Sequence, residues 1–236
     1  MAEDHPSVSV IIPVHNGHRY LSEAIDSVLC QGDYSLDILV VDDGSLDDSG
    51  KIARSFGAAL RYHYQTQLGA AQARNVGVAL TEGELIAFLD ADDIWTPNKL
   101  TTQLTALAKD TDLDMVFGHT EQFVSPDLDE DVRRTLQCAS EPMPAYLPSA
   151  ILVKRRSFNA VGPFSSDFEV GEFIDWYARA MDAGLSSSIL PEVLLRRRIH
   201  RANQGVIKRD SYQAEYMRIL RKSLQRRRAA ARKKSE

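Results

Sequence analysis

The sequence contains few cysteines and no long apolar run. Only Cys30 and Cys138 occur in 236 residues, and they form no recognisable motif, which is typical of a reducing compartment and excludes a disulfide framework. No apolar stretch reaches the roughly 18–20 residues of a membrane-spanning helix. The first ten residues, MAEDHPSVSV, have neither a basic nor an apolar region of the kind found in signal peptides. These absences predict a cytoplasmic protein.

Positive charge is scarce in most of the chain. The formal net charge is −5, but residues 218–236 contain nine Lys/Arg and one Glu, a sum of +8, so the preceding 217 residues carry −13. An acidic body argues against nucleic acid binding, and the basic end is the segment expected to contact an anionic partner.

The first 110 residues alternate between strand-like and helix-like segments in units of about 30 residues. Apolar runs rich in β-branched residues predict buried strands, at 8–14, 36–41, 60–64 and 84–90. Helical spacing of apolar residues, or a glycine stop, predicts helices after three of them, near 20–29, 47–57 and 69–80. The expected fold class is α/β, a mostly parallel sheet with helices on both faces.

The alternation weakens after residue 110. Four prolines among scattered acids predict a long loop at 125–148. The other expected elements are a strand at 113–119, a short helix ending at Gly162–Pro163, a helix from Glu172 to Gly184, a strand at 188–200 and a terminal helix at 209–228. We expect one domain over 1–208, in halves 1–110 and 111–208, followed by a helix and basic tail at 209–236.

Polar residues follow three of the predicted strands. They are Pro13, His15 and Asn16 after the first, Asp42 and Asp43 after the second, and Asp90, Asp92 and Asp93 after the fourth. Each cluster alone is equally compatible with a solvated turn. In an open parallel sheet, however, these ends meet at one edge, where ligands bind. Carboxylates crowded there repel unless a cation offsets them, and Mg²⁺ or Mn²⁺ with a diphosphate suits such oxygen donors.

Four segments in this order resemble the family 2 glycosyltransferases with the GT-A fold. They are VSVIIPVHNG, ILVVDDGSLDDS, GAAQARNVG and AFLDADD, and the resemblance extends over roughly residues 7–200. It implies inverting transfer of a sugar from a nucleotide diphosphate donor, with UDP the expected nucleotide. Residues 1–110 would bind the nucleotide sugar and 111–208 would face a saccharide, lipid-linked or peptide acceptor.

The same resemblance assigns roles to individual residues. Asp42 would accept a hydrogen bond from the base, Asp90 would face the ribose, and Asp92 would bind the Mn²⁺ or Mg²⁺ that bridges the diphosphate. Asp93 is a further candidate for that metal, and His200, in RRRIHRANQ, would close the metal site. The remaining donor-binding candidates are Pro13, His15 and Asn16, which would border the base, and Arg74, near the nucleotide.

An inverting transfer needs a base that takes the acceptor's proton. The family usually has an acidic pair after a glycine at a helix start, but Phe173 follows Glu172 in VGEFIDWYARA. Glu172 is the first candidate for the base, because the helix dipole favours its ionised form. Asp175, on the same face one turn later, is the second. Both acids could instead simply stabilise the helix.

Phe173 also keeps a second function open, a catalytically inactive glycosyltransferase-like protein that binds a nucleotide sugar or acts as a scaffold. A sugar-phosphate nucleotidyltransferase is disfavoured, because PVHNGHRYL lacks a glycine-rich phosphate loop. In the last helix, apolar residues repeat at helical spacing: Tyr212, Tyr216, Ile219, Leu220 and Leu224. This helix either packs on the domain or, through its basic end, contacts the inner face of an anionic membrane.

Overall fold

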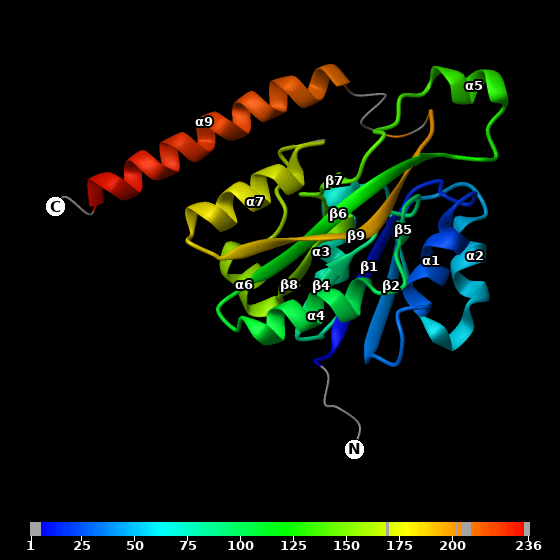
Figure 1. The fold of residues 1–236 in the computed structure, drawn as a ribbon, viewed down its shortest axis with the longest axis horizontal. Coiled ribbons are helices and arrows are strands. Elements are labelled where there is room, and N and C mark those ends of the chain that lie inside the picture. The colour runs from blue at the N-terminus through cyan, green and yellow to red at the C-terminus, as the bar shows by residue number, and fades with distance from the viewer. Residues whose placement is uncertain (1–5, 169, 202, 204–208, 234–236) are drawn as a thin grey trace.

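The computed structural model describes residues 6–168, 170–201, 203 and 209–233, with side chains of the last range described from residue 214 on except at 230, 231 and 233. One sheet runs through the molecule in the order β3-β2-β1-β4-β8-β6-β9-β5, with β7 paired to β6 (Figure 1). The predicted domain boundary at residue 208 lies outside the described residues.

The N-terminal half forms the parallel part of the sheet. Its strands are β1 (Val8–Val14), β2 (Leu36–Asp43), β3 (Arg61–Gln65) and β4 (Leu85–Phe88). Strand β1 pairs in parallel with both β2 and β4, and β2 pairs in parallel with β3. All seven residues of β1 are buried, as expected for a strand covered on both faces. The four strands confirm the predicted α/β half, although β4 ends two residues before Asp90.

The C-terminal half extends the sheet with mixed pairing. It consists of β5 (Ile94–Trp95), β6 (Met115–Val124), β7 (Met143–Pro144), β8 (Leu152–Lys154) and β9 (Ser187–Ile199). Strand β8 is antiparallel to β4 and β6, whereas β6 and β9 are parallel. The sequence predicted β6 and β9 but not β5, β7 and β8, each of which has only two or three residues.

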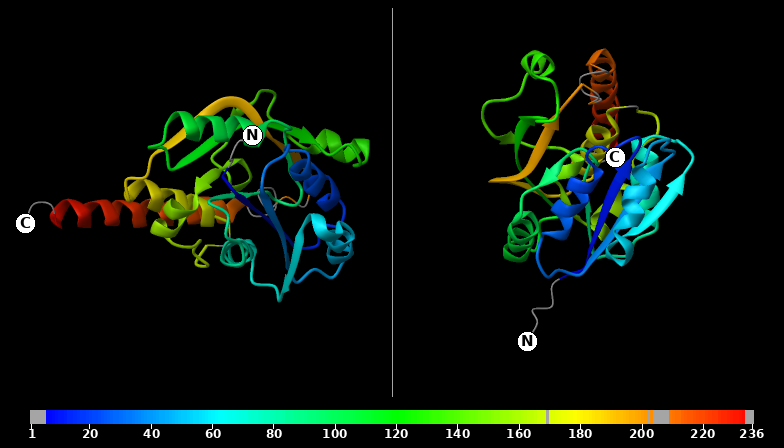
Figure 2. Two further views of the ribbon diagram at one scale, coloured as in Figure 1. Left: turned by 90° about the horizontal axis from the view of Figure 1, so that it is seen from below. Right: turned by 90° about the vertical axis from the view of Figure 1, so that its right-hand side faces the viewer.

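Helices cover both faces of the sheet, as predicted (Figures 1 and 2). On one face, α1 (Leu21–Leu29), α2 (Ser49–Ser55) and α4 (Lys99–Lys109) share an apolar core with Val8, Val10, Ile12 and Val14 of β1. On the other, α3 (Ala70–Ala79), α6 (Arg155–Val161) and α7 (Glu172–Asp182) pack against Ile11 and the alternate residues of β2 and β4. Because successive side chains of a strand face opposite sides of the sheet, alternate residues of these strands belong to two separate cores.

The predicted long loop at 125–148 is wrong in part. It contains the helix α5 (Glu130–Thr135) and β7, and ends in a 3₁₀ turn at Pro148–Ala150. Helix α5 has Glu130 and Asp131 in its first turn and two arginines in its last, an arrangement that the helix dipole favours. An ion pair between Arg134 and Glu130, 2.7 Å apart, adds a contact one turn apart.

The last helix, α9 (Arg209–Lys233), packs along α7 and then extends beyond the body of the molecule (Figures 1 and 2). Of the apolar residues predicted to form its packing face, only Ile219 is buried, while Tyr216, Leu220 and Leu224 are exposed. The side chain of Tyr212 lies outside the described residues. Among the helices that the structure describes, none combines the length and apolarity needed to cross a membrane.

Candidate active site

A cavity of about 1170 Å³ opens at the carboxyl ends of β1, β2 and β4. Nine of the predicted site residues line it: Pro13, His15, Asn16, Arg74, Asp90, Asp92, Asp93, Glu172 and His200. Two predicted residues, Asp42 and Asp175, do not belong to its lining. The sequence prediction that acids converge on one sheet edge is therefore supported by the geometry.

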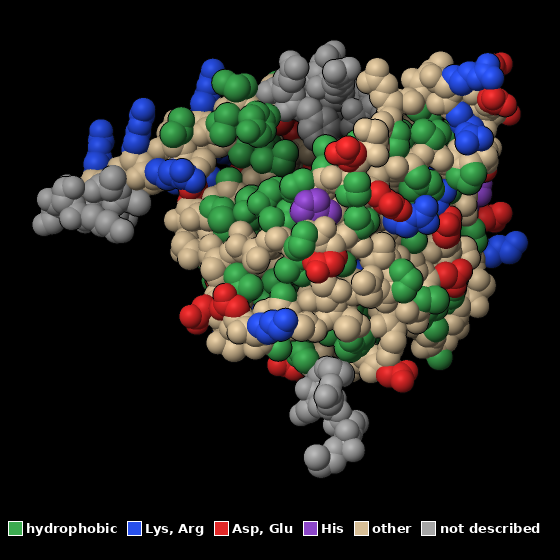
Figure 3. All heavy atoms as spheres, viewed as in Figure 1, with side chains coloured by type: hydrophobic (Ala, Val, Ile, Leu, Met, Phe, Trp, Pro, Cys, Tyr) green, Lys and Arg blue, Asp and Glu red, His purple; other side chains and the backbone are tan. Residues whose placement is uncertain are grey.

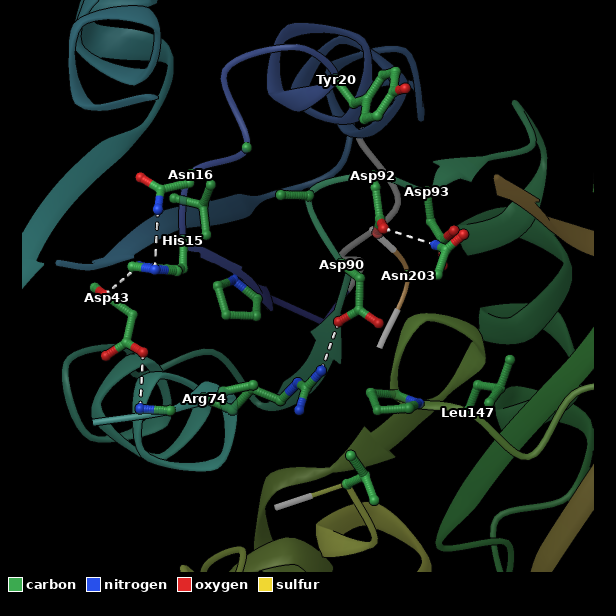
Figure 4. Close-up of a pocket in the computed structure, with 18 of the residues that line it drawn as sticks. His15, Asn16, Tyr20, Asp43, Arg74, Asp90, Asp92, Asp93, Leu147 and Asn203 are labelled. Carbon is green, nitrogen blue, oxygen red and sulfur yellow. Dashed lines mark hydrogen bonds and ion pairs between the residues drawn. The ribbon is translucent and has the colours of Figure 1, made fainter. Parts of the chain in front are cut away.

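Arg74 lies in the wall of this cavity, beside Asp90 (Figure 4). It comes from α3 and is 4% exposed. Its guanidinium donates to Asp90 Oδ1 at 2.6 Å and to Glu172 Oε1 at 2.7 Å. Burial lowers the pKa of Arg74, but the charges of Asp90 and Glu172 outweigh that effect and raise it. Arg74 is therefore a permanent cation that ties the end of β4 to the start of α7.

Asp92 meets residues that follow β9 (Figure 4). Its Oδ2 lies 2.9 Å from His200 Nε2 and accepts a hydrogen bond from Asn203 Nδ2 at 3.1 Å. Asn203 also donates to the carbonyl oxygen of Arg198, at 3.1 Å. Asp92 and His200, the two residues predicted to bind the metal, therefore lie next to each other. Sequence reasoning missed Asn203, although it stands three residues after the histidine in RRRIHRANQ.

Asp93 lines the cavity but is almost fully buried. It is 4% exposed and accepts a hydrogen bond from the backbone N–H of Arg198 at 3.1 Å. Burial, followed by the charges of Asp92 and Asp90, raises its pKa well above the ordinary range. Arg198 reaches past it to the carbonyl oxygen of Asp92, at 3.0 Å. Of the arginines at 196–198, Arg197 is the one that lines the cavity.

His15 and Asp43 form the opposite end of the cavity. His15 Nδ1 lies 2.8 Å from the carbonyl oxygen of Asp43, so Nδ1 is the donor and Nε2 faces the amides of Asn16 and Gln67. The Asp43 carboxylate accepts from the backbone N–H groups of Leu68 and Gly69, both at 2.8 Å. Asn16 adopts a left-handed conformation with φ of 52°, which asparagine tolerates better than most residues.

Asp42 points away from this cavity, whereas the sequence predicted that it would accept a hydrogen bond from the nucleotide base. Successive residues of a strand face opposite sides, so Asp43 faces α3 and Asp42 faces α2. The Asp42 carboxylate accepts from the hydroxyl of Tyr62 at 2.7 Å and from the backbone N–H of Ser45 at 2.8 Å. It lines a smaller neighbouring hollow of about 360 Å³.

The two candidate bases on α7 are placed differently. Glu172 is 8% exposed and lines the cavity, where it pairs with Arg74. Asp175 is 3% exposed and pairs with Arg179 at 2.9 Å, outside the cavity. Phe173 packs edge-on against Phe117, with ring centroids 6.2 Å apart. Phe173 thus belongs to an apolar core and also borders the cavity, and Glu172 is the carboxylate of α7 that lines the cavity.

Charge in the cavity is strongly unbalanced. Among the described lining residues, four are arginines: Arg19, Arg74, Arg197 and Arg201. Nine are acids: Asp43, Asp90, Asp92, Asp93, Asp127, Asp129, Asp167, Glu172 and Glu215. Such a surface repels an anion such as a diphosphate unless a cation binds with it.

The donor set fits a divalent metal that is shared with a ligand. Within the part of the chain that the structure describes, no three His, Cys, Asp or Glu side chains converge closely enough to enclose a metal ion. Mg²⁺ and related ions in nucleotide sites, however, commonly use one or two carboxylates together with substrate phosphates and water. Asp92 and the neighbouring His200 offer an oxygen and a nitrogen donor of that kind.

Comparison with known proteins identifies the family. The sequence model of glycosyl transferase family 2 matches residues 9–162. An uncharacterised glycosyltransferase of Rickettsia typhi is 30% identical over 237 residues, which cover 92% of this chain and 72% of that protein. The chain spans smaller shares of two further curated relatives, 65% in Rickettsia prowazekii and 22% in Rickettsia conorii. The chain belongs to glycosyl transferase family 2, which confirms the predicted family and enzyme class.

Solved structures confirm the predicted GT-A fold. The mannosyltransferase PcManGT of Pyrobaculum calidifontis, in complex with GDP-Man and Mn²⁺, superimposes with a TM-score of 0.71 at 18% identity, covering 94% of this chain and 65% of that one. TarS 1–349 of Staphylococcus aureus, in complex with UDP, gives 0.66 at 19% identity, covering 83% of this chain and 61% of that one. At such low identities the likeness concerns the fold alone.

Proposed function

We propose that this protein is a metal-dependent inverting glycosyltransferase that takes a sugar from a nucleotide diphosphate. One observation carries the proposal: Arg74 joins Asp90, at the end of a nucleotide-side strand, to Glu172, at the start of an acceptor-side helix. This bridge places a donor-side carboxylate and a candidate base on opposite sides of one cation, within a single cavity. A sugar bound in the cavity beside this guanidinium would lie near both carboxylates.

The nucleotide would lie along the part of the cavity that the N-terminal half of the chain lines. Pro13, His15 and Asn16 border the end of the cavity where we place the nucleotide base. The carboxylate at that end is Asp43 rather than Asp42. Asp90 is the candidate for the ribose, and Arg197 for the diphosphate, because a guanidinium binds phosphate oxygens well. The relatives in complex with UDP, UDP-GlcNAc and GDP-Man support a nucleotide-sugar donor without selecting one; UDP is our preferred nucleotide.

Asp92 and His200 are the residues that would hold Mn²⁺ or Mg²⁺. When bound, such an ion stabilises the negative charge that develops on the departing diphosphate. Asn203 would keep Asp92 oriented toward the cavity by its hydrogen bond. The Mn²⁺ complex of the Pyrobaculum mannosyltransferase supports a divalent metal in this fold.

Glu172 would act as the base. The acceptor oxygen forms a bond to the anomeric carbon on the face opposite the diphosphate, while the bond from that carbon to the diphosphate oxygen breaks. The nucleotide diphosphate leaves with the electron pair, and the acceptor proton passes to a Glu172 carboxylate oxygen. Arg74 holds this carboxylate at the cavity wall, so its position is fixed before the acceptor arrives.

A specific observation also favours contact of α9 with a membrane. The helix exposes Tyr216, Met217, Leu220 and Leu224 beside a strongly basic C-terminal end. Figure 3 shows apolar side chains on its visible face and Lys/Arg side chains toward its end. An apolar face next to basic residues is typical of helices that lie at an anionic lipid surface, where a lipid-linked acceptor would be found.

The proposed function is tested with a panel of UDP and GDP sugars, each with and without Mn²⁺. A ligand that binds only the native state raises its apparent stability, so the true donor should raise the melting temperature more with Mn²⁺ than without it. Release of nucleoside diphosphate from that donor then separates an enzyme from an inactive nucleotide-sugar-binding protein. Binding without any turnover, over a broad set of acceptors, would favour the inactive protein.

A further inference from the structure

Helix α9 contacts both ends of α7. At the far end, Asp182 of α7 binds Arg226 at 2.8 Å and Arg227 at 2.7 Å. At the near end, Ile219 is 1% exposed and lies against Gly171, the residue that precedes α7. The two helices run side by side (Figure 1). Helix α9 is therefore part of the acceptor side of the fold and not merely a charged tail.

Glu215 of α9 binds the backbone at the start of α7. Its Oε2 accepts hydrogen bonds from the N–H groups of Val170, at 3.0 Å, and Gly171, at 2.9 Å. The first N–H groups of a helix have no partner within the helix, and a carboxylate there also interacts well with the dipole. No side chain at the N-cap position of α7 makes such a bond, because that residue is Gly171. A distant glutamate instead binds the N–H groups of the N-cap residue and of the residue before it, and so holds the backbone that enters α7.

Gly171 leaves room for the side chains of α9 at this contact. A Cβ atom added there would lie 2.8 Å from Ile219 Cδ1 and 3.2 Å from Glu215 Oε2. A side chain at this position would therefore require the ends of the Ile219 and Glu215 side chains to shift. Gly171 therefore permits the close approach that lets Glu215 reach the backbone.

Helix α9 also holds the segment that leads into α7. Lys222 Nζ lies 3.1 Å from an Asp167 carboxylate oxygen, and Arg218 donates to the Asp167 carbonyl oxygen at 2.8 Å. Arg218 and Lys222 also lie over the ring of Phe168, at 4.5 Å and 4.9 Å from its centroid, respectively. Asp167, Phe168 and Glu215 line the same cavity as Glu172. One wall of the candidate active site thus depends on α9.

We propose that Glu215 is a positioning residue for Glu172. It fixes the backbone of Val170 and Gly171, and through them the first residue of α7, so that the Glu172 carboxylate meets Arg74 and the cavity. The inference rests on the proposed function, in which Glu172 is the base. Helix α9 becomes part of the catalytic unit, so that a change at Glu215 alters turnover without a change in the donor site.

The test compares Glu215→Ala with Glu215→Gln in the full chain. The readout is release of nucleoside diphosphate, with Mn²⁺, from the nucleotide sugar that most stabilises the wild-type protein. We expect Glu215→Ala to lower kcat by roughly 10- to 100-fold, as small misplacements of catalytic groups do, with KM for the donor unchanged. Glu215→Gln retains a carbonyl oxygen that can accept the same two hydrogen bonds, and should recover most of kcat.

Asp182→Ala is the matched control, because it removes a carboxylate from the other end of the same interface. It should lower thermal stability while kcat stays at the wild-type value. An unchanged kcat in Glu215→Ala, an equal loss in Asp182→Ala, or a Glu215→Gln variant as inactive as Glu215→Ala would each overturn the proposal.

Hydrogen exchange separates this inference from the proposed function. If the wild-type protein turns over no nucleotide sugar, the proposed function fails, but the backbone amides at the start of α7 can still be followed. Glu215→Ala should speed their exchange and Asp182→Ala should not. Equal exchange in the two variants would overturn the anchoring role.

Discussion

Arg74 and Glu172 form a buried ion pair across the cavity, with the guanidinium nitrogen 2.7 Å from the carboxylate oxygen. The other guanidinium nitrogen lies 2.6 Å from Asp90. A single side chain of α3 therefore fixes how far the candidate base lies from a donor-side carboxylate. A planar guanidinium can do this, whereas the compact ammonium of lysine offers no fork to span two acids.

We expect Arg74→Met to lower both stability and turnover. Loss of the cation leaves Glu172 buried without its partner, and breaking a buried pair in this way costs about 3–5 kcal/mol. Arg74→Lys should retain more stability but little turnover. The measurements are urea unfolding and nucleoside diphosphate release.

Arg179→Met is the control for this prediction. It breaks a partly buried pair on α7, with Asp175, that lies outside the cavity. It should destabilise the protein but leave donor binding intact. Equal turnover in the Arg74 and Arg179 variants would argue against a role of Arg74 in the site.

Glu172→Gln should separate chemistry from binding. A positioned base contributes roughly 10²- to 10⁴-fold to the rate, so turnover should fall by that factor. Affinity for the donor should hardly change, because the group acts on the acceptor. The comparison variant is Asp175→Asn, which removes charge from the same helix outside the cavity and should keep most of the turnover. The reverse result would assign the base to Asp175.

Asp92→Asn should remove the dependence of donor binding on Mn²⁺. The fold should survive, because fewer carboxylates then repel one another near Asp90 and Asp93. Calorimetric titration of UDP with and without Mn²⁺ measures the effect. Asp37→Asn, a change at a surface carboxylate paired with Arg61, is the control. Full Mn²⁺-dependent binding and turnover in Asp92→Asn would remove this residue from the metal site.

The sequence predicted the parallel half of the fold because its signals are local. A buried strand reads as an apolar run, and the acids that follow β4 stand directly after such a run. The short strands β5 and β8 were missed because two or three residues carry no period, and their pairing with β9 and β4 depends on distant segments.

The sequence predicted most residues of the site but not how their side chains are arranged in space. The family motif predicted Asp42 as the residue that binds the nucleotide base. Because successive residues of a strand face opposite sides, Asp43 faces the cavity instead. The bridge from Arg74 to Glu172 and the contact of Glu215 with Val170 and Gly171 join residues far apart in the chain, and no local pattern marks them. The exposed face of α9 likewise depends on which side of the helix packs against α7.

Lys99 gives a pH dependence of stability. Its amine is fully buried, 2.7 Å from Gln103 Oε1 and 4.1 Å from the centroid of the Trp95 ring. Burial lowers its pKa well below the ordinary value. The unfolded chain therefore binds more protons than the folded one between the two pKa values, so stability rises with pH toward the ordinary lysine pKa of about 10.4.

Chemical unfolding of wild type and Lys99→Met checks this sign. Between roughly pH 8 and pH 10, the wild type should gain stability relative to the variant, by at most about 1.4 kcal/mol per pH unit for one proton. Lys109→Met changes an exposed lysine at the end of the same helix and should follow the wild type. Parallel curves for wild type and Lys99→Met would contradict the prediction.

The last prediction concerns α9 and a membrane. Each Lys or Arg near an anionic surface contributes about 1 kcal/mol, and the charges of Arg226 and Arg227 are already partly offset by Asp182. The exposed Arg228 and Arg232, which follow the apolar face, are better placed to contribute. We expect the chain to sediment with liposomes that contain anionic lipid, and to do so less as salt rises, because salt screens exposed charges.

Two variants separate the contributions of charge and apolar surface. A version that ends at Gln225 loses six Lys/Arg but keeps the contacts of Glu215 and Ile219 with α7. The triple change Met217→Ser, Leu220→Ser and Leu224→Ser removes exposed apolar side chains and keeps every charge. Both variants should bind anionic liposomes more weakly than the full chain, and only the triple variant should keep the steep salt dependence. Equal sedimentation of all three proteins, or no response to salt, would exclude α9 as a membrane contact, because neither its charge nor its apolar face would then contribute to binding.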